Sequence, residues 1–101
     1  MPKIIFKAGV PDVKTDMKPA RLEIAKVHDD FWQESLTVTS TNDGKHGRDS
    51  LHYRRPPRAE DYRLPLRLRA YLDALRKRLG PDYQVILEKD HIHVELDIKG
   101  G

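Results

Sequence analysis

The chain has 101 residues, and we expect a single domain over residues 1–101 because this is the size of one small domain. Nineteen Lys and Arg face 16 Asp and Glu, and the net charge of +3 is too small to indicate a nucleic-acid binder by itself. The absence of cysteine excludes disulfides, thiolate zinc sites and cysteine nucleophiles. Any metal must therefore be held by His, Asp or Glu, and the chain carries five histidines.

The first half of the chain predicts a helix between two strands. Residues 3–7 predict a short edge strand, and residues 8–19 read as a loop because they contain glycine and prolines without a period. Apolar residues recur every three or four positions in residues 20–34, which indicates one helical stripe. On this helix His28 looks like an ordinary surface residue, and we expect Phe31 and Trp32 to pack under the sheet. The alternating, β-branched residues 35–40 predict a strand.

The middle of the chain predicts a long loop, a short strand and a second helix. Residues 41–58 are rich in Gly, Pro, Asn and Asp, and a loop of this length in a compact domain is generally functional or disordered. Residues 60–64 predict a short strand, after which Pro65 opens a helix with leucines at a four, three, four spacing. Gly80 suits the position just after this helix, and Pro81 prevents its continuation.

Residues 83–88 and 91–98 predict a hairpin that turns at Lys89 and Asp90. In its second strand the side chains of Ile92, Val94 and Leu96 share one face, and those of His91, His93, Glu95 and Asp97 share the other. The element order favours an α+β fold in which two helices pack on one face of a small antiparallel sheet.

Histidines and carboxylates concentrate in the long loop and in the last strand. Two imidazoles and one carboxylate form the ligand set of a hydrolytic zinc site with an open position for water. His46 and His52 of the loop could supply such ligands together with His93. A solvated sheet face and a polar loop decorated with histidines explain the same pattern without a metal.

Three separated segments resemble the zinc D-Ala-D-Ala carboxypeptidase family, which includes the phage L-alanyl-D-glutamate endolysins and shares its fold with the hedgehog signalling domain. The segments lie between about residues 36 and 96 and are Ser50-Leu51-His52-Tyr53, Arg58-Ala59-Glu60-Asp61 and Asp90-His91-Ile92-His93-Val94-Glu95. The resemblance implies a hedgehog/DD-peptidase-like fold.

The same resemblance implies a zinc site and its catalytic groups. It assigns His52, Asp61 and His93 as ligands of Zn²⁺, and Asp90 as the general base for a metal-activated water. His46 would line the site in a catalytic role. His91 and Glu88, and also Glu95, would lie beside the ligands.

The implied activity is hydrolysis of D-amino-acid-containing bonds in peptidoglycan stem peptides, as a D-Ala-D-Ala carboxypeptidase or an L-Ala-D-Glu endopeptidase. The N-terminus lacks the apolar run of a signal peptide, and no segment approaches the roughly 18–20 apolar residues of a membrane span. We therefore expect synthesis in a cytoplasm, and a phage-encoded enzyme acting on the host cell wall fits this expectation.

Two other functions compete with the peptidase. Asp61 follows His52 by nine residues, which is longer than the family's usual spacing, and Pro56 and Pro57 stiffen the extra length. The chain could therefore be a catalytically inactive zinc-binding structural or interaction module of the same fold. A nucleic-acid binder would use the basic residues of the loop and second helix, but no recognised module is present. Those residues are Arg54, Arg55, Arg58, Arg67, Arg69, Arg76, Lys77 and Arg78.

Overall fold

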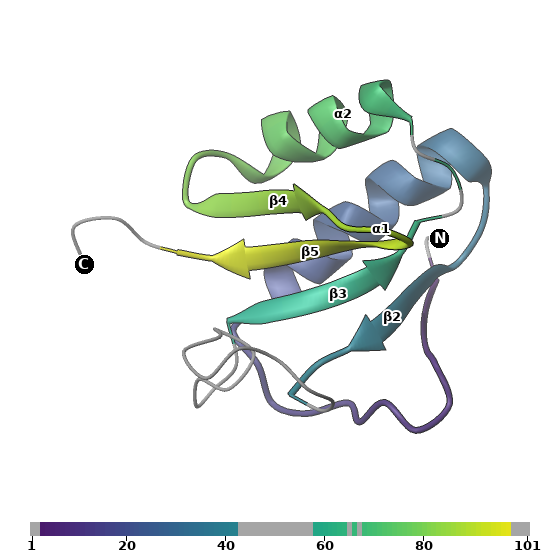
Figure 1. Cartoon of the computed structure of the whole chain (residues 1–101), viewed down its shortest axis with the longest axis vertical. Coiled ribbons are helices and arrows are strands. Elements are labelled where there is room, and N and C mark those ends of the chain that lie inside the picture. The colour runs from purple at the N-terminus through teal and green to yellow at the C-terminus, as the bar shows by residue number, and fades with distance from the viewer. Residues whose placement is uncertain (1–2, 43–57, 65, 67, 98–101) are drawn as a thin grey trace.

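The computed structural model describes residues 3–42, 58–64, 66 and 68–97, which form two helices and a five-stranded sheet (Figure 1). The elements are β1 (Ile4–Phe6), α1 (Lys18–Trp32), β2 (Leu36–Ser40), β3 (Ala59–Arg63), α2 (Arg69–Leu79), β4 (Tyr83–Leu87) and β5 (His91–Leu96). This arrangement confirms the predicted α+β class.

The sheet has the strand order β1-β2-β3-β5-β4 and is mixed. β1 pairs with β2 in parallel, while the β2–β3, β3–β5 and β4–β5 pairs are antiparallel. The prediction of a purely antiparallel sheet is therefore wrong at β1. The reason is that α1 acts as a crossover, which brings the chain back to start β2 in the direction of β1.

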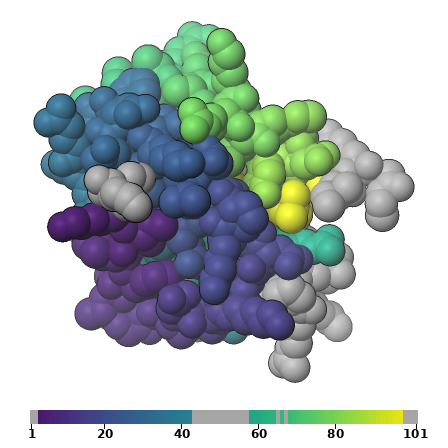
Figure 2. Space-filling view, turned by 180° about the vertical axis from the view of Figure 1, so that it is seen from behind, coloured from purple at the N-terminus to yellow at the C-terminus, as the bar shows by residue number. Residues whose placement is uncertain are grey.

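The two helices cover one face of the sheet, and Figure 2 shows this side with α1 in blue and α2 in green. Alternation along β5 sends Ile92 and Val94 into the core, as predicted, and both are fully buried. The core also contains Leu36 and Val38 of β2 and Leu75 of α2. The opposite face carries the polar alternates of the same strands and is not covered by either helix.

Helix α1 starts at Lys18, and Pro19 lies in its first turn, where no backbone N–H is needed. Helix α2 starts at Arg69, so the prediction that Pro65 opens this helix is wrong. Leu68 has an extended backbone (φ −109°, ψ 114°) and forms the N-cap. After α2, Gly80 has a φ of 85°, which glycine adopts readily, and the predicted end of the helix is confirmed.

An aromatic cluster joins the two helices. The ring centroids of Trp32 and Tyr71 are 4.3 Å apart, and those of Phe31 and Tyr71 are 5.5 Å apart. Phe31 is 38% exposed, so the expectation that it packs under the sheet is wrong, whereas Trp32 is partly buried and packs against the core. The buried face of α1 is wider than the predicted stripe and includes Arg21 and His28, so His28, which was expected at the surface, is only 2% exposed.

A buried ion pair connects α1 to β3 on the core side of the sheet. Arg21 is bound by both carboxylate oxygens of Glu60, and its Nε donates to Oε1 at 2.9 Å. The hydroxyl of Tyr62 donates to the same Oε1 at 2.8 Å, and Glu60 and Tyr62 are fully buried. A buried carboxylate needs such partners because its desolvation is costly. The pair holds β3 against α1.

Candidate functional site

The candidate site lies on the uncovered face, where β2, β3 and β5 run side by side. Asp61 of β3 pairs in register with His93 of β5, so both side chains are on this face. Asp61 Oδ1 lies 2.9 Å from His93 Nδ1. Asp61 is only 7% exposed, so this carboxylate is held in a largely desolvated position by its neighbours.

The second ring nitrogen of His93 faces another carboxylate. Nε2 lies 2.8 Å from Oε1 of Glu95, two residues further along β5. Burial, the largest single influence, lowers the pKa of His93, but the hydrogen bonds and charges of Asp61 and Glu95 outweigh it, and the net pKa is raised. The site therefore favours a positive charge at this imidazole.

Asp90 and His91 extend the cluster to the hairpin turn. His91 Nδ1 lies 2.9 Å from Oδ1 of Asp90, and His91 Nε2 lies 3.7 Å from Oδ2 of Asp61. The hydrogen bond from His91 lowers the pKa of the Asp90 carboxyl, with a smaller contribution from nearby charge. Asp90 is exposed and is therefore an ionised carboxylate that solvent and ligands can reach at neutral pH.

A pocket of about 260 Å³ opens beside this cluster. A bulge in β2 shapes one side of it, because Val38 pairs with Tyr62 while Ser40 pairs with Asp61, the next residue back along β3. The lining residues combine carboxylates, cations and hydroxyls, and they are Lys7, Thr39, Ser40, Asp61, Arg63, Asp90 and His91.

The structure brings together five of the eight residues that the sequence assigned to the site: Asp61, His93, Asp90, His91 and Glu95. Glu88 is exposed and contributes its backbone N–H, which donates to the carbonyl of His91 at 3.0 Å. His46 and His52 lie outside the described residues.

Lys7 and Arg63 are cationic pocket residues that the sequence analysis missed. Arg63 is two residues from Asp61 on β3, so the alternation of a strand could have placed both on one face. No local signal identifies Lys7, because it reaches the pocket through the pairing of β1 with β2, which lies outside the range of sequence periodicity.

The donor types at Asp61 and His93 fit zinc, which binds carboxylate oxygen and imidazole nitrogen. Within the described residues, no group of three or more His, Asp or Glu side chains is arranged to hold a metal ion. Asp61 and His93 are two of the three residues that the resemblance assigns to zinc, and the third, His52, lies outside the described residues. No helix in the described part of the chain is long and apolar enough to cross a membrane.

No protein-family model matches the sequence, and a comparison with curated proteins finds no match.

Proposed function

We propose that this chain is a zinc-dependent peptidase with a hedgehog/DD-peptidase-like fold, which hydrolyses D-amino-acid-containing bonds of peptidoglycan stem peptides. The observation that carries the proposal is the contact between Asp61 and His93. The resemblance assigns both residues to zinc. They lie 32 positions apart in the chain, yet Asp61 Oδ1 is 2.9 Å from His93 Nδ1. A phage-encoded endolysin acting on the host wall is the setting that the resemblance suggests.

Asp61 and His93 would hold the zinc together with His52. When bound, zinc would act as a Lewis acid that activates water and polarises the peptide carbonyl. Glu95 supports this role because its carboxylate lies 2.8 Å from His93 Nε2 and orients the ring. For Asp61 and His93 both to bind zinc, the proton between Asp61 Oδ1 and His93 Nδ1 would have to leave.

Asp90 is the proposed general base. Its lowered pKa keeps the carboxylate ionised at neutral pH, and its exposure at the hairpin turn allows access to a substrate. His91 links it to the ligand Asp61, since one ring nitrogen faces each carboxylate. Asp90 takes a proton from the attacking water and passes it to the nitrogen of the leaving amine. The peptide bond therefore breaks to release a neutral amine and not an amine anion.

Substrate binding would use the two cations of the pocket. Lys7 and Arg63 are exposed and line the same 260 Å³ pocket as Asp61 and Asp90. Stem peptides carry free carboxylates, and guanidinium and ammonium groups bind carboxylates through charge-assisted hydrogen bonds. The pocket therefore combines cations that would bind the substrate with carboxylates that would serve zinc binding and catalysis.

The second candidate is a catalytically inactive zinc-binding module of the same fold. The observation that favours it is the spacing of nine residues from His52 to Asp61, which is longer than the family's usual spacing. Such a module would bind zinc and gain stability from it, but it would not turn over a substrate.

Metal analysis combined with a peptidoglycan digest tests the proposal. We expect about one zinc per chain. We expect mass spectrometry to detect cleaved stem peptides or free D-Ala. A chelator should abolish this cleavage, and added zinc should restore it. A zinc-loaded protein that leaves both intact peptidoglycan and D-Ala-D-Ala dipeptides uncut would support the inactive module. A chain that binds no zinc would contradict both.

A further inference from the structure

Strand β4 forms one edge of the sheet, and the backbone groups on its outer side point away from β5. Two hydrogen bonds set the alternation of the β4–β5 ladder: Glu88 N–H donates to the His91 carbonyl, and Asp97 N–H donates to the Asp82 carbonyl. The backbone groups of even-numbered residues therefore turn toward β5, and those of Val85 and Leu87 turn outward. In the described part of the chain no strand pairs with this outer side.

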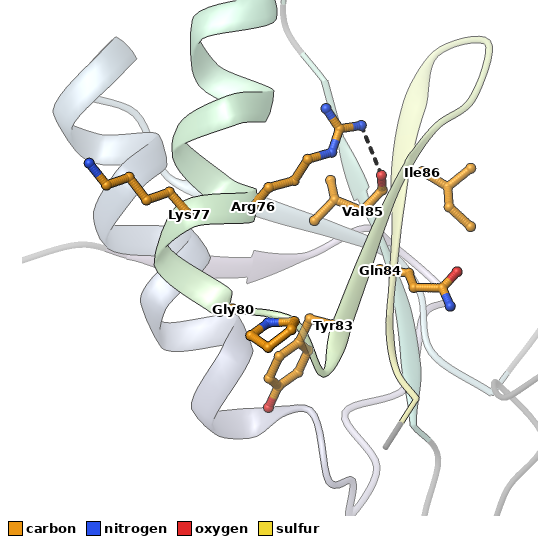
Figure 3. Close-up of a pocket in the computed structure, with 8 residues that line it drawn as sticks. Arg76, Lys77, Gly80, Tyr83, Gln84, Val85 and Ile86 are labelled. Atoms are coloured by element: carbon orange, nitrogen blue, oxygen red, sulfur yellow. Dashed lines mark hydrogen bonds between the residues drawn. The ribbon is translucent and has the colours of Figure 1, made fainter. Parts of the chain in front are cut away.

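A groove of about 630 Å³ runs along this edge between β4 and α2 (Figure 3). Arg76 reaches across from α2, and its Nη2 donates to the outward-facing carbonyl of Val85 at 3.0 Å. Gln84 and Ile86 point to the other side of the strand. The guanidinium thus already satisfies this carbonyl, and a backbone N–H of an added strand would have to share or displace it at Val85.

The sequence of β4 itself lacks the residues that usually prevent strand addition. Protected edge strands carry charged residues, proline or bulges. Residues 83–87 contain none of these, since they read Tyr-Gln-Val-Ile-Leu and pair with β5 without a register shift. Ile86 is 39% exposed on the uncovered face of the sheet. The strand is therefore both open and apolar enough to accept another strand.

Charge selects the kind of strand that fits. Arg76 and Lys77 line the groove, and no carboxylate does. Helix α2 as a whole carries four cations against one carboxylate, Asp73. Pairing of β4 with β4 of a second copy would bring two such cationic helices together, and this repulsion disfavours a symmetric dimer through this edge. An anionic partner is favoured instead.

We propose that the groove between α2 and β4 binds an extended acidic polypeptide segment as a sixth strand of the sheet. Backbone hydrogen bonds to Val85 and Leu87 supply affinity, and alternate side chains supply specificity. Side chains on the helix side meet Arg76 and Lys77, which favours Glu or Asp. Those on the uncovered side lie beside Ile86, which favours apolar residues. This site is separate from Asp61 and His93 and does not depend on zinc.

Nuclear magnetic resonance of the full ¹⁵N-labelled chain tests the proposal with a capped hexapeptide of alternating Glu and Val. We expect the largest amide shifts and new protection from hydrogen exchange at Val85 and Leu87, whose N–H groups face outward. A capped Lys-Val hexapeptide of the same length is the charge control and should bind at least about tenfold more weakly.

Two matched variants locate the charge. Arg76→Gln keeps a donor for the Val85 carbonyl but removes the charge, and we expect about a fivefold loss of affinity for the Glu-Val peptide. Arg69→Gln makes the same change on the exposed first turn of α2, outside the groove, and should lose less than about twofold. Thermal melting checks that both variants fold. The proposal would be overturned if the two peptides bound equally well or if the amide shifts were centred away from Val85 and Leu87. It would also be overturned if the two variants lost affinity equally or if the chain self-associated through β4.

Discussion

Asp61 and His93 face each other across the β3–β5 pair, with Asp61 Oδ1 2.9 Å from His93 Nδ1. The contact depends on the register of the two strands. A slip of one residue would turn Asp61 toward the helices and place a carboxylate in the core, which is a costly position. The same register places Glu60, the residue before Asp61, against Arg21 in the core. One pairing thus builds both the candidate site and the buried ion pair.

Replacement of Asp61 tests the zinc assignment. Asp61→Asn keeps the size of the side chain but removes its charge, and we expect zinc affinity to fall by at least about tenfold. Competition with a chromophoric chelator measures the affinity. Asp82→Asn is the matched control, because Asp82 is an exposed carboxyl outside the pocket. Equal affinities in the two variants would contradict the assignment of Asp61.

Replacement of Asp90 separates catalysis from metal binding. For Asp90→Asn we expect peptide hydrolysis to fall by about 10²–10⁴-fold, because the proton acceptor is lost, while the zinc content stays unchanged. Mass spectrometry of digested stem peptides gives the rate, and metal analysis gives the zinc content. Asp73→Asn, an exposed carboxyl on α2, should leave both unchanged. Full activity in Asp90→Asn would exclude Asp90 as the base.

The ion pair between Arg21 and Glu60 predicts a strong effect on stability. Glu60→Leu leaves the guanidinium buried without its main partner, and we expect the free energy of unfolding to fall by about 3–5 kcal/mol in urea. The double variant Arg21→Met, Glu60→Leu removes both charges and should recover most of this loss. If the loss of unfolding free energy in the double variant equals the sum of the losses in Arg21→Met and Glu60→Leu, the two side chains are not energetically coupled.

The buried His28 predicts a loss of stability in acid. Burial lowers its pKa below the ordinary value, although the charges of Glu34 and Asp29 act in the opposite direction. The unfolded chain takes up a proton near pH 6.5 while the folded protein keeps the neutral ring, so stability falls as the pH drops below this value. The loss is complete once the pH is below the folded pKa.

His28→Phe removes this titration and retains the aromatic contacts with Trp32 and Tyr71. We expect the difference in Tm between about pH 8 and about pH 5 to be smaller in the variant than in the natural sequence. The comparison isolates His28 because the other histidines are the same in both proteins. An unchanged pH dependence would show that His28 does not titrate between the folded and unfolded states.

The contrast between His28 and His93 shows the limits of local patterns. Both are histidines in amphipathic elements, and alternation along β5 correctly placed His93 on the polar face. The helical stripe placed His28 at the surface, but α2 packs beside this stripe and buries His28 against Tyr71. A strand has two faces, whereas a second helix can bury a neighbouring stripe of a helix in addition to the one that faces the sheet.

By itself the sequence determined the α+β class, the hairpin, the end of α2 at Gly80 and the division of β5 into an apolar and a polar face. These features follow from side-chain periodicity and backbone preferences, which act over a few neighbouring residues. Only the tertiary structure decided that β1 is parallel, that Lys7 and Arg63 share a pocket with Asp61, and that Glu60 binds Arg21. These depend on the register and packing of segments far apart in the chain, which no local pattern specifies.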